Sequence, residues 1–316
     1  MLSLETKQKY NKNKYCIGEV VNGDNKGKRI YYSDIDDKNN IVDIDEKLSA
    51  KYLRKFKKNI TMHDIRTLQD CLINNKNPPN ELNKIYSLLK EEVRKANIET
   101  VLTRGKFVCC PNMDFPIKKD FEKANHMYIA GATGSGKSYY IADYLRLINK
   151  YQPKREIFIF SDVEHDKAFE NLSNVTRIAI DMTLVNEPIT PAELQDSVCL
   201  FDDIDSIPNK TIKKTVYTLM NSLYRRGRHE NITVISTTHN ITDYLKSRTA
   251  INESGTIVLF LHSGSTNGQR YIMSKYIGLD TPTIKEIMRI KSRAVQIHKS
   301  FPMFVSWEGG CKLINQ

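Results

Sequence analysis

The feature that most constrains the fold is an eight-residue run at positions 131–138, GATGSGKS. It matches the pattern G-x-x-x-x-G-K-[ST] completely, follows a short apolar run at 126–130, and precedes a segment with helically spaced apolar residues from Ile141 to Ile148. Glycines let such a loop curl so that its N–H groups point at a phosphate, and the helix start adds partial positive charge. The pattern predicts a strand, a phosphate loop and a helix.

This loop gives each of its residues an expected role. Lys137 should reach the β- and γ-phosphates of ATP, and the Ser138 hydroxyl should be a ligand of Mg²⁺. The predicted nucleotide-binding residues are the loop and the residue after it: Gly131, Ala132, Thr133, Gly134, Ser135, Gly136, Lys137, Ser138 and Tyr139. The complete match in its strand and helix setting weakens the alternative, a chance glycine-rich turn.

A second motif is an apolar strand at 197–201 that ends in two acidic residues. Asp202 is expected to hold Mg²⁺, directly or through water, and Asp203 to orient and deprotonate the attacking water as general base. Asp203 is one methylene shorter than the Glu that many such enzymes use. Asp205 is interpreted as a cap for a helix beginning near Lys210.

A third strand, expected at 232–236, runs into a polar segment. A polar residue at the end of a strand beside the acidic one is well placed to touch both the γ-phosphate and the attacking water. We assign this sensor to Asn240, with His239, Thr237 and Thr238 as alternatives. The residues could also simply close a turn.

Arginines follow the amphipathic helix that precedes this strand. Their distance from the loop in sequence is typical of an arginine finger, which completes the site of a neighbouring subunit. Arg228 is the first candidate and Arg225 the second. Binding to DNA phosphates or pairing with surface carboxylates are the alternatives. If the finger acts in trans, an isolated subunit should be a poor ATPase.

The periodicity changes after Pro111, from where short apolar runs alternate with helical patterns. The predicted fold class is α/β, a P-loop NTPase of the RecA/ASCE type with a mainly parallel central sheet flanked by helices, plus a smaller α+β N-terminal domain. The predicted domains are 1–110, of unknown role, and 111–316, the ATPase motor. A strand at 177–180 is expected between the phosphate-loop strand and the acidic strand.

The N-terminal region has its own pattern. Strands at 15–21 and 28–32 should form a hairpin, and Thr61 with Asp64 resembles the start of a helix. Further helices are expected at two places, 47–58 and 81–96. The lysine-rich run from 51 to 58 is interpreted as the solvated side of a helix, with phosphate contact as the alternative.

Composition points to a polyanionic partner. Against 37 acidic residues stand 48 Lys plus Arg, a formal net charge of +11 with a pI near 9.2. Codon bias and plain solvation of the surface explain the charge equally well. The charge therefore indicates a nucleic-acid partner only together with a motif. Two basic segments are candidates for DNA contact: the lysines at 210, 213 and 214, and the turn at 263–270.

Cysteines and apolar stretches restrict the class of protein further. The six cysteines show no C-x-x-C spacing, so reduced thiols and no structural metal are expected. No apolar stretch is long enough to span a bilayer. We therefore expect a soluble intracellular protein.

Taken in order, the motifs resemble those of the FtsK/HerA superfamily, and more closely the genome-packaging ATPases of nucleocytoplasmic large DNA viruses, the poxvirus packaging ATPase among them. The matching pieces are GATGSGKS at 131–138, VCLFDD at 198–203, RRGRHENITVISTTHNITDYL at 225–245 and SRAVQIHKSFP at 292–302. The resemblance covers roughly 120–305, and the last piece looks like the closing strand of that domain.

The resemblance implies a homo-oligomeric ring, a pentamer or hexamer, that hydrolyses ATP between subunits and drives double-stranded DNA into a preformed capsid. It also implies capsid or inner-membrane virion proteins as partners, and a place in the host cytoplasm, in the virus factory, or in the virion. The chain departs from bacterial FtsK relatives at His239 and Asn240, where those have Gln. A HerA-like DNA-processing translocase, or an ATP-dependent switch or scaffold, is the alternative.

Overall fold

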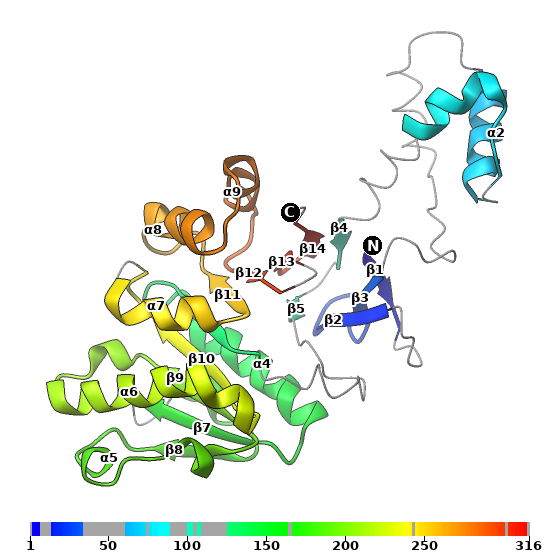
Figure 1. Ribbon diagram of the computed structural model, residues 1–316. Helices are drawn as coiled ribbons and strands as arrows, with labels where there is room; N and C mark the ends of the chain where they lie inside the picture. Colours follow the sequence, from blue (N-terminus) through cyan, green and yellow to red (C-terminus); the bar gives the residue numbers. More distant parts are fainter. Residues whose placement is uncertain are drawn as a thin grey trace.

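The fold comes from a computed structural model that describes residues 2–6, 14–33, 61–73, 76–88, 100–103, 106–108, 125–163, 166–241, 244–300 and 303–314 (Figure 1). Its centre is a ten-stranded sheet with the strand order β4-β14-β13-β12-β11-β6-β10-β9-β7-β8. Helices cover both faces of the parallel part of this sheet. The predicted α/β class, a P-loop fold with a mainly parallel sheet, is confirmed.

Six neighbouring strands, from β8 to β11 in that order, run parallel. Their bounds are β6 Met127–Ala130, β7 Glu156–Ser161, β8 Val175–Ile178, β9 Ser197–Asp202, β10 Thr233–Thr238 and β11 Thr256–Leu259. All six therefore end at one edge of the sheet, here called the carboxyl edge, and begin at the opposite one, the amino edge. Polar residues that follow different strands meet at the carboxyl edge.

The expected position of one strand was wrong. The strand predicted at 177–180 is β8, and it forms the outer end of the sheet beside β7. The strand between the phosphate-loop strand β6 and the acidic strand β9 is β10. Helix α6, Lys210–Arg226, returns the chain to the amino edge, so a strand later in sequence is inserted between two earlier ones.

The other four strands extend the sheet antiparallel beyond β11. Their bounds are β12 Val295–His298, β13 Phe304–Trp307, β14 Gly310–Leu313 and β4 Thr100–Leu102. The strand predicted within 292–302 is β12. Because β4 pairs with β14, residues 100–102 belong to the edge of the large sheet, although the sequence analysis assigned them to the N-terminal region.

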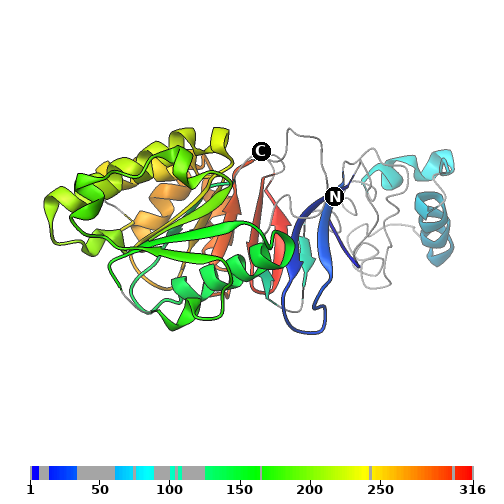
Figure 2. The same cartoon turned by 90° about the horizontal axis from the view of Figure 1, so that it is seen from below.

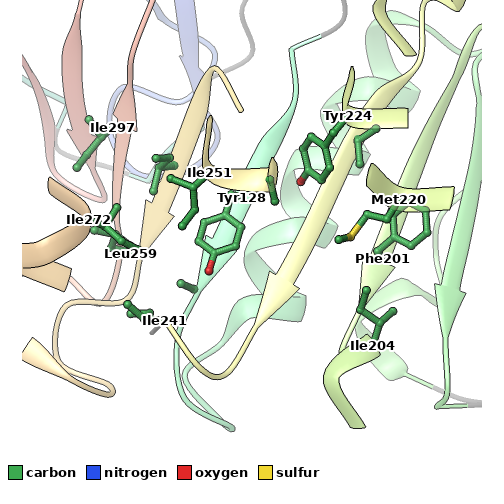
Figure 3. Close-up of a cluster of buried hydrophobic side chains, with 14 of the residues drawn as sticks. Tyr128, Phe201, Ile204, Met220, Tyr224, Ile241, Ile251, Leu259, Ile272 and Ile297 are labelled. Carbon is green, nitrogen blue, oxygen red and sulfur yellow. The ribbon is translucent and has the colours of Figure 1, made fainter. Parts of the chain in front are cut away.

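Successive side chains of each strand point to opposite faces of the sheet, so the sheet has an apolar core on each face. Val198 and Leu200 of β9 point toward helix α4, Lys137–Tyr151. Cys199 and Phe201, the alternate residues, point toward α6. Figure 3 shows this second core, where Tyr128, Met220 and Tyr224 lie with Phe201 between sheet and helices. Fully buried apolar strands of this kind are the mark of a sheet covered on both faces.

The remaining helical elements lie in the connections. The α-helices are α2 Met62–Ile73, α5 Thr183–Asn186, α7 Tyr244–Glu253, α8 Thr266–Tyr271 and α9 Thr281–Ile287, with a π-helical turn at Ile272–Tyr276. Short 3₁₀ turns occur at Asn80–Leu82, Lys167–Phe169, Pro191–Leu194, Ile204–Ser206 and Gly227–Glu230.

The N-terminal residues form a smaller sheet, ordered β1-β3-β2-β5, beyond the antiparallel end of the large one (Figure 2). Its strands are β1 Leu2–Glu5, β2 Lys14–Val20, β3 Arg29–Ser33 and β5 Phe107–Val108. The predicted hairpin is confirmed as β2 and β3. Ile17 and Ile30 pack with Phe304 and Cys311 of the large sheet, so an apolar cluster joins the two sheets.

The predicted helix start at Thr61 is also confirmed. Thr61 N–H donates to Asp64 Oδ2 at 2.8 Å, and Asp64 N–H donates to Thr61 Oγ1 at 3.2 Å. Residues 83–88 are helical within the predicted span 81–96. Residues 89–96 of that span and the predicted helix at 47–58, with its lysine run, lie outside the described residues.

Candidate nucleotide site

The phosphate loop lies between the end of β6 and the start of α4, at the carboxyl edge. Gly134 and Gly136 have φ values of 73° and 99°, which glycine adopts without strain. Gly136 is the residue before α4 and supplies no side-chain cap. The first N–H groups of this fifteen-residue helix therefore point toward the loop, as an anion site requires.

The Lys137 side chain is folded over the loop. Its Nζ donates to Gly131 O at 3.0 Å and to Ala132 O at 3.3 Å. Burial lowers the pKa of Lys137, while Asp203 and Asp202 oppose that shift. This buried ammonium group lies where a phosphate chain cradled by the loop would pass.

The two acidic residues at the end of β9 are joined by a threonine of β10. Thr237 Oγ1 donates to Asp202 Oδ1 at 2.9 Å and accepts from Asp203 N–H, also at 2.9 Å. Burial raises the pKa of Asp202 to about 6, and the neighbouring charge of Asp203 adds to the rise. Asp203 itself adopts a left-handed backbone, with a φ of 50°.

His239 connects the acidic pair with the loop. Its Nε2 lies 2.7 Å from Asp203 Oδ1, and its Nδ1 lies 3.0 Å from Lys137 Nζ and 3.3 Å from Thr133 Oγ1. The lysine ammonium can only donate, so Nδ1 accepts and the Nε2–H donates to Asp203. Sequence reasoning named His239 as an alternative sensor. The structure gives it a contact with both the predicted base and the predicted phosphate lysine.

The sensor predicted from sequence, Asn240, lies one residue further on and is exposed. Its backbone N–H donates to Thr238 Oγ1 at 3.2 Å. Thr238 Oγ1 in turn donates to Asp205 Oδ2 at 2.8 Å. Asn240 thus lies at the margin of the acidic site, and its role stays a prediction.

The interpretation of Asp205 as a helix cap was wrong. The α6 cap is Asn209, whose Oδ1 accepts from the N–H groups of Thr211 and Ile212 at 2.9 and 3.2 Å. Asp205 instead accepts hydrogen bonds from the Tyr217 hydroxyl and from Thr238. It ties α6 to the end of β10, next to the acidic pair.

Both candidate finger arginines lie far from the loop of their own chain. Arg225 is in the last turn of α6, and Arg228 is in the 3₁₀ turn that leads into β10 at the amino edge. Arg228 Nη2 donates to Glu253 O at 3.0 Å. A finger role for either residue is therefore possible only toward another subunit.

The residues present suit a magnesium–nucleotide complex. Mg²⁺ bound with a nucleotide takes oxygen ligands from one or two protein side chains and from phosphates and water. Asp202 offers a buried carboxylate, and Ser138 lies in the first turn of α4. Within the described ranges no group of three or more His, Cys, Asp or Glu residues could hold a metal by itself.

A glycine-rich loop joins a parallel strand to a helix, and the acidic strand end is separated from that strand by one intervening strand. This geometry is that of a P-loop nucleotide-binding fold. No family model matches the chain. Uncharacterized protein V3 of Sputnik virophage is 37% identical over 228 residues, which are 72% of this chain and 89% of V3. The chain belongs to the same family as V3.

Solved structures give weaker similarities. The genome packaging NTPase B204 of Sulfolobus turreted icosahedral virus 2, in complex with AMPPCP, is 14% identical with a TM-score of 0.41, covering 58% of this chain and 97% of B204. The conjugation coupling protein TcpA of pCW3, in its monomer form with ATPgS, is 14% identical with a TM-score of 0.42, covering 67% and 65% of the two chains. No helix among the described residues is long and apolar enough to cross a membrane.

Proposed function

We propose that this protein is an ATPase that uses Mg²⁺–ATP to move double-stranded DNA, and that it packages a viral genome. The observation that carries the ATPase part is the chain of contacts from Lys137 through His239 to Asp203. It links the group expected to hold the γ-phosphate with the group expected to activate water. The resemblance of the sequence motifs to those of viral packaging ATPases supports the genome-packaging part, and the relative from a virophage supports a viral setting.

Each side chain of the site has a defined task in the proposed reaction. The loop N–H groups and Lys137 hold the phosphates, and Ser138 with Asp202 holds Mg²⁺, which neutralises the charge that develops on them. Asp203 accepts the proton of the attacking water as general base. The Nε2–H of His239 fixes the orientation of the Asp203 carboxylate.

His239 also makes the site responsive to the γ-phosphate. Lys137 must turn from His239 Nδ1 and the loop carbonyls to reach phosphate oxygens. His239 Nδ1 then loses its donor, while the Nε2–H still donates to Asp203. We therefore assign the sensor to His239, with Asn240 beside it as the residue first predicted from sequence.

The first test is steady-state ATP hydrolysis with and without long double-stranded DNA, over a range of protein concentrations, with Lys137→Ala as the blank. A DNA translocase with shared sites should show DNA stimulation that falls with added salt, and a specific activity that rises with concentration. Slow hydrolysis that is indifferent to DNA and concentration would instead favour a switch or scaffold ATPase.

A second test asks whether the finger acts in trans. Lys137→Ala and Arg228→Ala should each be nearly inactive alone, and their mixture should recover part of the activity because some interfaces then combine an intact loop with an intact arginine. The same mixture with Arg225→Ala distinguishes the two candidates. A mixture that stays inactive for both arginines removes the proposed finger but leaves the phosphate-loop assignment unchanged.

Genome packaging and HerA-like DNA processing differ only in the partner. The net charge of +11 suits DNA in either case. Copurification with capsid proteins from infected cells would support packaging, and copurification with a nuclease would support DNA processing.

A further inference from the structure

The connection between β11 and β12 carries a helix that the proposed reaction does not use. It consists of α8 and the π-helical turn that follows, which together span 266–276 (orange in Figure 1). The basic turn at 263–270, one of the two segments expected to contact DNA, runs into this helix. A π-helical turn is rare, and such turns occur frequently at functional sites.

One side of this helix is buried and the other is exposed. The buried positions are Gly268, Gln269, Ile272 and Met273. Exposed residues alternate with them in pairs, four positions apart, and so share the opposite face: Thr266, Asn267, Arg270, Tyr271, Ser274 and Lys275. These six residues are here called the outer face of α8. Each of these residue types forms hydrogen bonds to phosphate groups in protein–DNA complexes.

The charge of the outer face is positive only. No Asp or Glu occurs from 254 to 279, in a chain with 37 acidic residues among 316. Arg270 and Lys275 have no ion-pair partner among the described residues. The next acidic side chains are engaged elsewhere, since Asp280 caps α9 and Glu286 pairs with Lys312. The outer face therefore attracts a polyanion without competition from carboxylates of its own.

An aromatic ring lies on the outer face next to these charges. Tyr271 is 48% exposed, and its ring meets the edge of the Tyr276 ring with the centroids 6.0 Å apart. The two residues are five positions apart, which is the hydrogen-bond spacing of a π-helical turn. The contact holds the Tyr271 ring at the surface, where its hydroxyl can donate to a phosphate.

The buried side of the same helix is joined to the phosphate loop. Gln269 is fully buried, and its Nε2 donates to Phe260 O at 2.9 Å and to Ser263 O at 3.4 Å. The Ala132 N–H of the loop donates to Ser263 Oγ at 3.3 Å. A polyanion on the outer face would therefore contact a helix that hydrogen bonds connect to the nucleotide site.

The other basic segment, at the start of α6, is less suited to a polyanion. Lys213 Nζ already donates to Asp205 O. The segment also follows Asp202, Asp203 and Asp205 within a few residues, and their negative charge repels phosphate.

We propose that the outer face of α8 binds the phosphate backbone of double-stranded DNA, with Arg270 and Lys275 as the cationic contacts and Tyr271 as a neutral donor beside them. The inference rests on the proposed function, which requires contact with DNA but assigns no residue to it. Phosphate contacts carry no sequence information, so the outer face suits a motor that must hold every sequence of a genome.

The experiment measures how DNA affinity depends on salt. A fluorescently labelled DNA duplex is titrated with the full chain, and anisotropy gives the association constant at several salt concentrations. Each lost phosphate contact should make the slope of log association constant against log salt concentration shallower by about 0.9. The double variant Arg270→Ala, Lys275→Ala should therefore reduce the slope by about 2 and weaken binding at about 0.1 M salt by roughly 50-fold.

Two further variants separate charge from other effects. Lys154→Ala removes an exposed lysine at the amino edge, ahead of β7, and should change neither the slope nor the affinity. Tyr271→Phe removes only a neutral hydroxyl, so it should weaken binding by about threefold without changing the slope. A merely structural role of Arg270 and Lys275 would lower the melting temperature and leave the slope unchanged. Thermal melting is therefore measured on every variant.

The outcomes are distinguishable. If the unaltered protein binds duplex DNA but the double variant keeps its salt slope, the outer face of α8 is not the contact and the proposed function stands. A slope that changes only in Lys210→Ala, Lys214→Ala overturns the inference in the same way. If the unaltered protein does not bind duplex DNA and DNA does not stimulate its ATP hydrolysis, DNA translocation fails and the outer-face contact fails with it.

Discussion

The two edges of the parallel sheet carry similar residues with opposite consequences. At the amino edge, Arg155 donates to Ser197 O, Asn231 O and Thr233 Oγ1 at 2.9 to 3.1 Å, and so ties the start of β9 to the start of β10. Lys299 Nζ similarly donates to the carbonyls of Ile251 and Asn252. These polar groups stabilise the fold.

At the carboxyl edge, buried groups of both charges lie together beside the phosphate loop. Lys137 is buried with a lowered pKa, and Asp202 is buried with its pKa raised to about 6. Ligands of opposite charge would stabilise the charged forms of both side chains: phosphate for the lysine and Mg²⁺ for the carboxylate. Burial also lowers the pKa of Lys299 at the amino edge, to about 8, so a shifted pKa does not by itself mark a site. The comparison teaches that buried charges mark a site where groups of both signs meet beside a phosphate loop.

The largest effect should come from Lys137→Ala. Losing a charge-assisted contact to phosphate should weaken ATP binding by roughly 10- to 100-fold and abolish hydrolysis, with little change in melting temperature. Lys299→Ala is the matched control at the amino edge, and it should lower the melting temperature but keep ATP affinity within about twofold. Calorimetry and thermal melting measure both. Equal losses of ATP affinity in the two variants would remove the distinction between the edges.

Arg155→Met should show the reverse pattern. It removes a buried guanidinium and leaves the backbone carbonyls of Ser197 and Asn231 without that donor, which should lower the free energy of unfolding by about 3 kcal/mol. ATP affinity per folded molecule should not change. Urea denaturation, followed by circular dichroism, measures the free energy of unfolding. A large loss of ATP affinity with unaltered stability would contradict the structural role.

His126 should make the amino edge sensitive to acid. Burial, with the charge of Arg228, lowers its pKa to about 3, and its Nδ1 accepts from Val234 N–H at 3.1 Å. Below about pH 6.5 the unfolded histidine takes up a proton that the folded one cannot, so stability falls with pH, by about 2 kcal/mol between pH 6.5 and 5.

The variant His126→Asn keeps an acceptor near Val234 N–H and removes the titration. As the pH falls from 7.5 to 5, the unaltered protein should therefore lose more unfolding free energy than this variant, as measured by urea denaturation. A difference that does not depend on pH would show that His126 is not the group responsible.

The smallest effect tests whether location alone decides function. Asn209 lies near the carboxyl edge but only caps α6, so Asn209→Ala should cost about 1 kcal/mol of stability. ATP turnover per folded molecule should stay the same. It is measured as the hydrolysis rate without denaturant, at a temperature well below the melting temperature. Reduced turnover at full stability would extend the site to this helix end.

The sequence by itself determined the features that depend on neighbouring residues. The loop at 131–138, the acidic strand end at 202–203 and the hairpin of β2 and β3 each follow from short-range requirements: glycine at left-handed φ, a fully apolar strand, and alternation around a turn. The mainly parallel sheet followed from alternating strand and helix patterns. These signals are local, so a single sequence is enough to recognise them.

Tertiary structure decided which distant residues meet. The strand order was not readable, because α6 returns the chain so that β10 enters between β6 and β9, and only that insertion brings Thr237 and His239 to Asp203. Gln296 of β12 meets Tyr140 of α4 for the same reason, since β12 pairs with β11 and β11 with β6. Contacts between strands depend on the path of the whole chain, and no local pattern of residue types encodes that path.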